Sequence, residues 1–207
     1  NVTAMLGLGY FKSGFEVRAR DLTPGTELAY RSYTVKCVEA EHTVPSLAYS
    51  LQELPRPGRF DVQKARALGI PQGPIFRKLQ HGKQVTVKGR KVRPEDVLGP
   101  SRAGRKVVYS GDTKPSTRVI ELARGADVLI HDCTLDSSHS DLAADFGHST
   151  AAEAARVANE AGVGVLFLVH ISPRYDGVED LEVEARATFK NSKVAEDLSE
   201  YVVRYRD

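Results

Sequence analysis

Three apolar runs in the second half of this 207-residue chain each lead into a cluster of polar residues, and this repeated pattern constrains the fold more than any other feature. Each run is predicted to be a strand; the runs and their polar ends lie at residues 106–113 (SGDT), 127–135 (HDCT) and 163–175 (HISPRY). Helical patterns follow the first two runs at residues 116–125 and 150–162. Alternating strands and helices predict an α/β fold whose polar strand ends gather at one edge of a sheet, where such folds usually assemble their sites.

Local signals mark where one of these helices begins and ends. Thr150 and Glu153 have the spacing of a capping box, and Gly162 is a typical stop. The remaining elements predicted outside the middle of the chain are half-buried strands at residues 15–20 and 33–53 and a closing helix at residues 193–203.

The middle of the chain, residues 54–105, has a different character. It is rich in Gly and Pro, with one short helix predicted at residues 61–69 and a β-ribbon at residues 83–92. Few of its residues are expected to form a core. We therefore expect a single domain over residues 1–207 with a protruding insertion at about 55–95, and not an independent second domain.

Charge is distributed very unevenly along the chain. Residues 56–106 carry 14 Lys and Arg against three acidic residues, a net charge of +11, whereas the rest of the chain carries −9. A basic block inside an acidic body is typical of a protein that contacts a phosphate backbone. The alternative is a solvated lysine-rich loop.

Several simpler features restrict the class of protein. No apolar run approaches the roughly 20 residues that a membrane span needs, and the N-terminal sequence has no basic-then-apolar signal pattern. Only two cysteines are present, Cys37 and Cys133, which predicts a reducing, cytoplasmic location. The chain starts at Asn1 and its single methionine is Met5, so we expect it to begin inside a longer protein.

Three of the candidate ligands for a metal ion follow predicted strands. His42 and His170 are two of the six histidines, and Asp112 lies in a glycine-flanked loop. A carboxylate and imidazoles that converge from separate loops would suit zinc or manganese. The alternative for each histidine taken singly is a structural or surface role.

The segments SGDT, ADVLIHDCTL, GHSTAAEAA and LVHISPRY, in this order and spacing, resemble the C-terminal portion of ribonuclease Z. This family has the metallo-β-lactamase fold, an αββα sandwich, and trims the 3′ end of precursor tRNA. Its members carry a protruding arm with a Gly-Pro motif that grips the tRNA. Here GRFDVQKARALGIPQGPIFRKL supplies that motif at Gly73 and Pro74, with Arg77 and Lys78 behind it. The resemblance therefore implies a basic tRNA-binding arm and covers essentially the whole chain.

The resemblance also implies roles for particular residues. It implies two divalent metal ions, with zinc expected, held in part by His42, Asp112 and His170. It implies that His148 protonates the leaving 3′ oxygen and that Asp132 orients His148. Asp132 stands where the family usually has glutamate, and the alternative for it is to cap a turn.

The same resemblance implies contacts with the substrate. Arg174 and Tyr175 would hold phosphate, because a guanidinium matches phosphate oxygens and a phenol adds one more hydrogen bond. Ser149 and Thr150 are expected to cap a helix first and to contact substrate second. The other histidines have open roles: His131 packed or supporting a ligand, His139 in an exposed loop, and His81 either on RNA or solvated.

One family motif, His-x-His-x-Asp-His, is absent from the chain. In the family it lies upstream of the position where Asn1 falls. The parent protein is thus expected to be a metal-dependent endoribonuclease, whereas these 207 residues alone should bind metal poorly and cleave nothing. We expect precursor tRNA as the partner, and a homodimer in which the arm of one subunit serves the other. The alternatives are another phosphodiesterase of the same fold and a non-catalytic RNA-binding relative.

Overall fold

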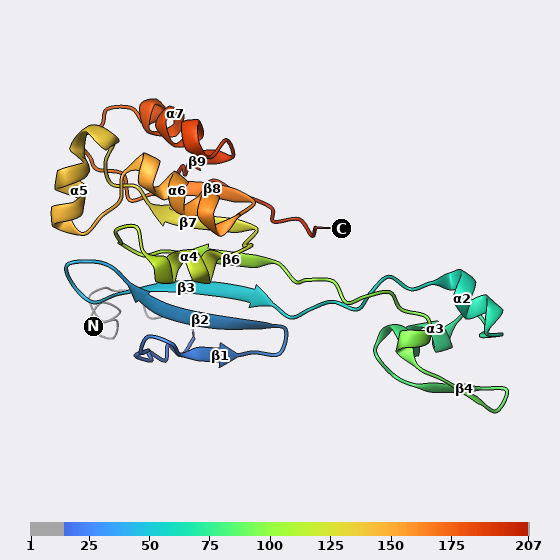
Figure 1. Cartoon of the computed structure of the whole chain (residues 1–207). Helices are drawn as coiled ribbons and strands as arrows, with labels where there is room; N and C mark the ends of the chain where they lie inside the picture. Colours follow the sequence, from blue (N-terminus) through green and yellow to red (C-terminus); the bar gives the residue numbers. More distant parts are fainter. Residues whose placement is uncertain (1–14, 207) are drawn as a thin grey trace.

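A computed structural model describes residues 15–206 of the chain, and its centre is one mixed β-sheet (Figure 1). The seven strands lie in the order β1-β2-β3-β6-β7-β8-β9, antiparallel from β1 to β6 and parallel from β6 to β9. The strands are β1 (Glu27–Ala29), β2 (Tyr33–Ala40), β3 (Ser46–Glu53), β6 (Lys106–Tyr109), β7 (Val128–Asp132), β8 (Val165–Val169) and β9 (Ser192–Val194). The three apolar runs are therefore strands, as predicted.

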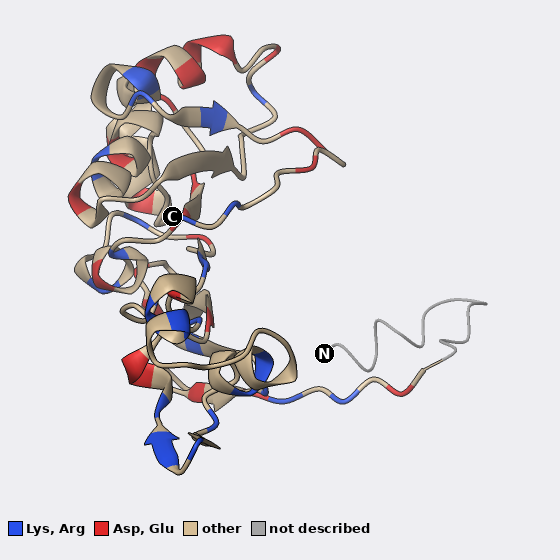
Figure 2. Cartoon of the chain, turned by 90° about the vertical axis from the view of Figure 1, so that its right-hand side faces the viewer, with Lys and Arg blue, Asp and Glu red and all other residues tan. Residues whose placement is uncertain are grey.

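Helices cover one face of this sheet, as the turned view in Figure 2 shows. They are α4 (Thr117–Ala123), α6 (Ala151–Ala161) and α7 (Glu179–Thr188). Helix α6 packs closely because five of its six buried residues are alanines, whose small side chains let the helix approach the strands. The described residues thus form one sheet with one layer of helices, which is one half of the predicted αββα sandwich.

The predicted boundaries of α6 are confirmed. Thr150 accepts a hydrogen bond from the backbone N–H of Glu153, and the Glu153 carboxylate accepts one from the backbone N–H of Thr150. Gly162 ends the helix with a φ of +63°, a conformation that glycine adopts without strain.

Two predicted elements are wrong. Residues 15–20 form no strand, although their apolar residues alternate. Residues 193–203 form no helix: Val194 is in β9, and its backbone N–H donates to the Glu182 carboxylate of α7. Tertiary contacts outweigh local helix propensity there. Two helices outside the inserted segment were missed, α5 (Ser140–Phe146) and α7.

The inserted segment, residues 54–105, projects from the sheet (Figure 1). It contains α2 (Val62–Ala67), α3 (Pro74–Gln80), the ribbon β4 (Val85–Val87) and β5 (Arg90–Val92), and the short helix η1 (Pro94–Asp96). The expectation that few of its residues form a core is wrong. Its outer part has a separate small core, made by Ala65, Ile70, Leu79, Val87, Val92 and Val97 with Phe60, Leu68, Ile75, Phe76 and Val85 packed around them. Such a small core gives the projection a defined shape.

The inserted segment leaves the sheet between β3 and β6, at the edge opposite the polar strand ends. Strand β3 runs from Ser46 to Glu53, and the insertion follows it directly. A strand of eight residues is about 26 Å long, so this length separates the start of the insertion from the polar strand ends. Among residues 15–206, no helix has the length and apolar character that crossing a membrane requires.

Candidate metal and catalytic site

The carboxyl ends of β6, β7 and β8 bring Asp112, Asp132 and His170 to one edge of the sheet. The turn after β2 adds His42, because β2 runs parallel to β6 and so ends at the same edge. His148 comes from the loop between α5 and α6. Sequence spacing did not establish that these residues converge, and the structure does bring them together.

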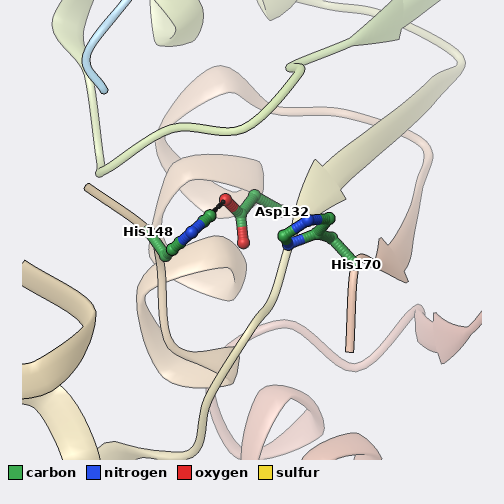
Figure 3. Close-up of side chains that lie close together, drawn as sticks. All are labelled: Asp132, His148 and His170. Carbon is green, nitrogen blue, oxygen red and sulfur yellow. Dashed lines mark hydrogen bonds and ion pairs between the residues drawn. The ribbon is translucent and has the colours of Figure 1, made fainter. Parts of the chain in front are cut away.

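His148 and Asp132 form a close pair (Figure 3). His148 Nδ1 lies 2.7 Å from Asp132 Oδ2, and the Asp132 side chain is fully buried. Asp132 also accepts hydrogen bonds from the backbone N–H groups of Thr113 and Thr134 and from the Thr134 hydroxyl. Because a carboxylate only accepts, His148 must donate through Nδ1, which leaves Nε2 for other chemistry. The contact expected between Asp132 and His148 is present.

His170 is held in a similar way through Thr134. The Thr134 hydroxyl donates to Asp132 Oδ1, so the hydroxyl accepts from His170 Nδ1, which lies 2.8 Å away. Nε2 of His170 then faces Asp112 Oδ2 at 3.7 Å. His170 has a φ of +65°, a left-handed conformation that is uncommon outside glycine and is often found at functional sites.

His42 is fixed by a carbonyl group that is distant in the sequence. Its Nδ1 lies 2.8 Å from the carbonyl oxygen of Gly147 and must donate to it, which leaves Nε2 as the free lone pair. A side chain at position 147 would meet His42 Nδ1 at 2.7 Å and the backbone nitrogen of Thr43 at 2.8 Å, so only glycine fits. The rings of His42 and His170 each lie 4.9 Å from the ring of His148.

The donor set suits a divalent cation. Ligand atoms of Asp132, His148 and His170 lie within 4.8 Å of one another. Both Asp132 oxygens are already occupied by the hydrogen bonds described above, so Asp132 is better placed to orient His148 than to bind metal. His42 and His170 instead have a free Nε2 backed by a hydrogen bond at Nδ1, the usual arrangement of a metal-binding histidine.

His131, whose role was left open, is packed in the interior. It is fully buried, and its Nδ1 bonds the backbone carbonyl of Asp132. Burial lowers the pKa of His131, because the charged imidazolium would lose its hydration. Neutral His131 therefore supports the end of β7, where Asp132 lies.

Arg174 and Tyr175 lie on the loop after β8. Arg174 is exposed, whereas the Tyr175 hydroxyl donates to the Asp136 carboxylate at 2.9 Å and accepts the Asp136 backbone N–H at 2.8 Å. The pKa of Asp136 is lowered, first by the hydrogen bond from Ser138. His139 bonds the same carboxylate and is only partly exposed, so it is not the open loop residue expected. The phosphate contacts predicted for Arg174 and Tyr175 stay predictions.

Ser149 and Thr150 are buried and their hydroxyls point inward. Ser149 donates to the backbone carbonyl of Thr113, and Thr150 belongs to the capping box of α6. Their structural role is clear, and the substrate contact stays a prediction.

The Gly-Pro motif lies on the inserted segment, away from the histidines (Figure 1). Gly73, with a φ of +138°, precedes α3, and Pro74 is the first residue of that helix. Arg77 and Lys78 are exposed on α3. These four residues cannot contact the histidine cluster of the same chain, and their role in binding tRNA stays a prediction.

Sequence reasoning missed three residues that organise the site. Thr134 links Asp132 to His170, Thr113 donates its backbone N–H to Asp132, and Gly147 holds His42. Thr134 could have been recognised, because it is the last residue of HDCT and lies two positions after the aspartate. The Gly147 contact carries no local signal.

Comparison with known proteins gives a consistent result. The family model described as "Beta-lactamase superfamily domain" matches residues 49–171. Proteins named Ribonuclease Z are 48% identical in Methanosarcina acetivorans and 50% identical in Methanosarcina mazei, each over 96% of this chain and 66% of the relative. In Thermoplasma volcanium the identity is 40%, over 99% of this chain and 67% of the relative. The chain thus spans about two thirds of the length of these relatives.

Solved structures support the fold. The metallo-beta-lactamase fold protein YhfI from Bacillus subtilis matches 84% of this chain and 51% of its own, with a TM-score of 0.55 and 19% identity. Human tRNase Z, short form, matches 86% of this chain and 46% of its own, with a TM-score of 0.52 and 22% identity. The predicted metallo-β-lactamase fold is confirmed, and the superfamily is one associated with divalent metals. The chain therefore belongs to the ribonuclease Z family of the metallo-β-lactamase superfamily.

Proposed function

We propose that this chain is part of an endoribonuclease that removes the 3′ trailer from precursor tRNA. The observation that carries the proposal is the Asp132–His148 pair beside His42, Asp112 and His170, on the scaffold of relatives named Ribonuclease Z. A cytoplasmic location, expected from the cysteine content, belongs to the same proposal.

His42, Asp112 and His170 would hold divalent metal, with two zinc ions expected and the other ligands supplied outside these residues. Bound metal would activate a water molecule and stabilise negative charge on the phosphodiester. Asp112 and His170 are suited to this because Asp112 Oδ2 and His170 Nε2 face each other 3.7 Å apart. Accordingly, residues 1–207 alone should bind metal poorly and should not cleave.

His148 supplies the proton in this proposal. Its Nδ1–H is committed to Asp132 at 2.7 Å, so Nε2 is the atom that gives a proton to the leaving 3′ oxygen. Asp132 fixes the ring orientation and stabilises the imidazolium, as the carboxylate of a catalytic triad does. Arg174, exposed at the end of the next loop, would bind phosphate.

The inserted segment would hold the body of the tRNA. It carries most of the +11 charge of residues 56–106, and Figure 2 shows its Lys and Arg residues in the part nearest the viewer. Gly73, Pro74, Arg77 and Lys78 would contact the RNA backbone. Because the segment leaves the sheet about 26 Å from the site, the proposal includes a homodimer in which each segment serves the partner's site.

A deletion tests the division between chemistry and RNA binding. Phe60 and Leu98 form an antiparallel β-bridge at the base of the outer part of the insertion. Residues 61–97 can therefore be replaced by a short glycine link in the complete protein. Cleavage of a precursor tRNA should fall by orders of magnitude, while hydrolysis of bis(p-nitrophenyl) phosphate should stay within threefold of wild type. Loss of both activities would contradict the assignment.

His148→Ala in the complete protein is the matched catalytic test. It should abolish tRNA cleavage while tRNA binding is kept. If the unmodified complete protein binds tRNA with bound metal and cleaves nothing, the enzyme proposal fails and the non-catalytic RNA-binding alternative takes its place. Vigorous hydrolysis of small phosphodiesters without tRNA cleavage would instead favour the other phosphodiesterases of this fold.

A further inference from the structure

Two segments of the chain, residues 54–60 and 98–105, join the inserted segment to the sheet. They form a narrow connection that we call the stem. Arg56 and Arg102 exchange backbone hydrogen bonds of 2.7 and 2.9 Å, and the other bridge pairs Phe60 with Leu98. The stem also has one further backbone bond, from Gly99 to Arg59, and two side-chain bonds, from Ser101 to Arg56 and from Arg102 to Pro57. An isolated two-stranded ribbon is marginally stable. The stem's own bonds therefore leave the direction of the outer part poorly constrained.

A segment remote in the sequence supports the stem. Residues 201–206 run toward it along the sheet, as the red end of the ribbon in Figure 1 shows. The ring of Tyr205 contacts two guanidinium groups: Arg56 is 3.4 Å from the ring centroid and Arg105 is 4.3 Å from it. Cations on the faces of an aromatic ring are attracted by its negative potential.

The Arg56 contact accounts for an unusual feature of that side chain. Nε and Nη2 of Arg56 are buried and have no hydrogen-bond partner among residues 15–206. Buried polar nitrogens without hydrogen bonds are costly, and the Tyr205 ring lies against this guanidinium. Arg56 belongs to the stem, so the position of the stem depends on Tyr205.

Arg105 ties the same ring to the base of the stem. Its Nε donates to the Glu53 carboxylate at 2.9 Å. The Arg105 backbone N–H donates to the same carboxylate, and the Glu53 backbone N–H donates to the Arg105 carbonyl oxygen. Nη1 of Arg105 donates to the carbonyl oxygen of Val203 at 3.1 Å. The base of the stem and residues 201–206 are thus joined by backbone and side-chain bonds as well as by the ring.

The other contacts of residues 201–206 are with the sheet. Arg206 Nε lies 2.6 Å from Asp127, and Arg206 Nη2 donates to the carbonyl oxygen of Ala126. The ring of Tyr201 packs edge-on to Phe167 of β8, with the centroids 5.1 Å apart. The segment is therefore fixed to the rigid sheet at both ends, with Tyr205 directed at the stem.

We propose that residues 201–206 are a brace that sets the direction of the inserted segment, with Tyr205 as a positioning residue for tRNA. Fixing the stem to β6, β7 and β8 holds the RNA-binding surface at a defined distance from the site at the far edge of the sheet. The effect on tRNA rests on the proposed function, whereas the effect on the direction of the segment does not.

The direction can be measured without activity, by pulsed electron paramagnetic resonance on the complete protein. Nitroxide labels at Thr86→Cys and Glu160→Cys would report the distance between β4 and α6, since both positions are exposed. Cys37 and Cys133, the two cysteines of this chain, are fully buried and should not react. Tyr205→Ala should broaden and shift the distance distribution, while Tyr205→Phe, which keeps the ring, should match wild type.

Phe146→Ala is the control, because Phe146 is an exposed aromatic residue of α5, at the opposite end of the structure from the stem (Figure 1). It should leave the distribution unchanged. An unchanged distribution in Tyr205→Ala would overturn the brace. If Tyr205→Phe broadened the distribution as Tyr205→Ala does, the hydroxyl bond to Glu53 and not the ring would position the stem, and the proposal as stated would fail.

Kinetics give the second readout. Tyr205→Ala should raise KM for precursor tRNA roughly fivefold, the ratio expected for one partly desolvated cation–π contact, with kcat within twofold. Hydrolysis of a small phosphodiester should not change, and Tyr205→Phe should restore KM. A fall in kcat on both substrates would show a general loss of structure and refute a positioning role. If wild type does not cleave tRNA and the distances still shift, the proposed function fails and the brace stands.

Discussion

Asp132→Asn should show how much the orientation of His148 contributes to cleavage, because the variant keeps the histidine but removes the carboxylate that orients it. The carboxylate accepts two hydrogen bonds at each oxygen: Oδ2 from His148 and Thr113, and Oδ1 from the backbone and hydroxyl of Thr134. An amide has one oxygen and one donating NH₂ group. In either orientation the NH₂ group therefore faces groups that now donate to Asp132, either His148 and Thr113 or the two donors of Thr134. If the NH₂ group faces His148, Nδ1 must accept, so the neutral imidazole carries its proton at Nε2 and loses the carboxylate that stabilises its imidazolium form.

The expected magnitude follows from this geometry. Removing the equivalent carboxylate in a catalytic triad lowers kcat about 10⁴-fold, so Asp132→Asn should lower kcat by about 10³- to 10⁴-fold. A buried donor left unsatisfied costs about 1–3 kcal/mol, and the free energy of unfolding should fall by that amount. Single-turnover cleavage of precursor tRNA and urea unfolding of the complete protein measure the two effects.

Glu184→Gln is a matched acid-to-amide control. Glu184 accepts hydrogen bonds from Ser137 and from the backbone of Ala152, but it does not contact the histidines. It should lower stability while kcat stays within threefold of wild type. A kcat for Asp132→Asn that also stayed within threefold would refute the claim that Asp132 orients the proton donor.

Three further predictions concern acid stability, metal binding and the cap of α6. The Arg105 guanidinium lowers the pKa of Glu53 from 4.5 to about 2, so this carboxylate stabilises the fold above about pH 4.5 and the contribution is lost as the pH falls toward 2. In urea unfolding, the difference between wild type and Glu53→Gln should therefore be largest above pH 5 and vanish near pH 2; a difference independent of pH would contradict this. Asp112→Ala should lower the metal content of the dialysed complete protein, measured by mass spectrometry, and an unchanged content would remove Asp112 from the ligands. Thr150→Ala should reduce the free energy of unfolding by about 1–2 kcal/mol and Thr150→Ser by much less, because serine keeps the hydroxyl that caps Glu153; equal losses would show that the methyl group matters more.

The elements predicted correctly from the sequence have strong local signals. Helix α6 has its capping box and Gly162, and the strands β6, β7 and β8 are short apolar runs between turns. Parallel strands bring their carboxyl ends to one edge, so the polar strand ends were expected at the same edge, although the sequence did not show that Asp112, Asp132 and His170 converge. These parts of the fold and site follow from local chemistry and one topological rule.

The parts that sequence reasoning missed depend on contacts between distant residues. His42 is placed by Gly147, which is 105 positions away. Helix α3 was not predicted, although it starts at Pro74 and proline at the first helical position favours a helix. The core of the inserted segment combines residues from α2, α3, β4 and β5, and none of these elements has enough apolar residues to reveal it alone.

The place where the insertion enters the sheet has a consequence for how such proteins diversify. Glu53 and Arg105 lie side by side, so the chain leaves and returns at almost the same point. The entropic cost of closing a loop grows only with the logarithm of its length, by about 0.6 kcal/mol for each doubling. Segments of very different size can therefore be exchanged at this junction with little penalty to the sheet, so that the same sheet and site can carry different peripheral modules.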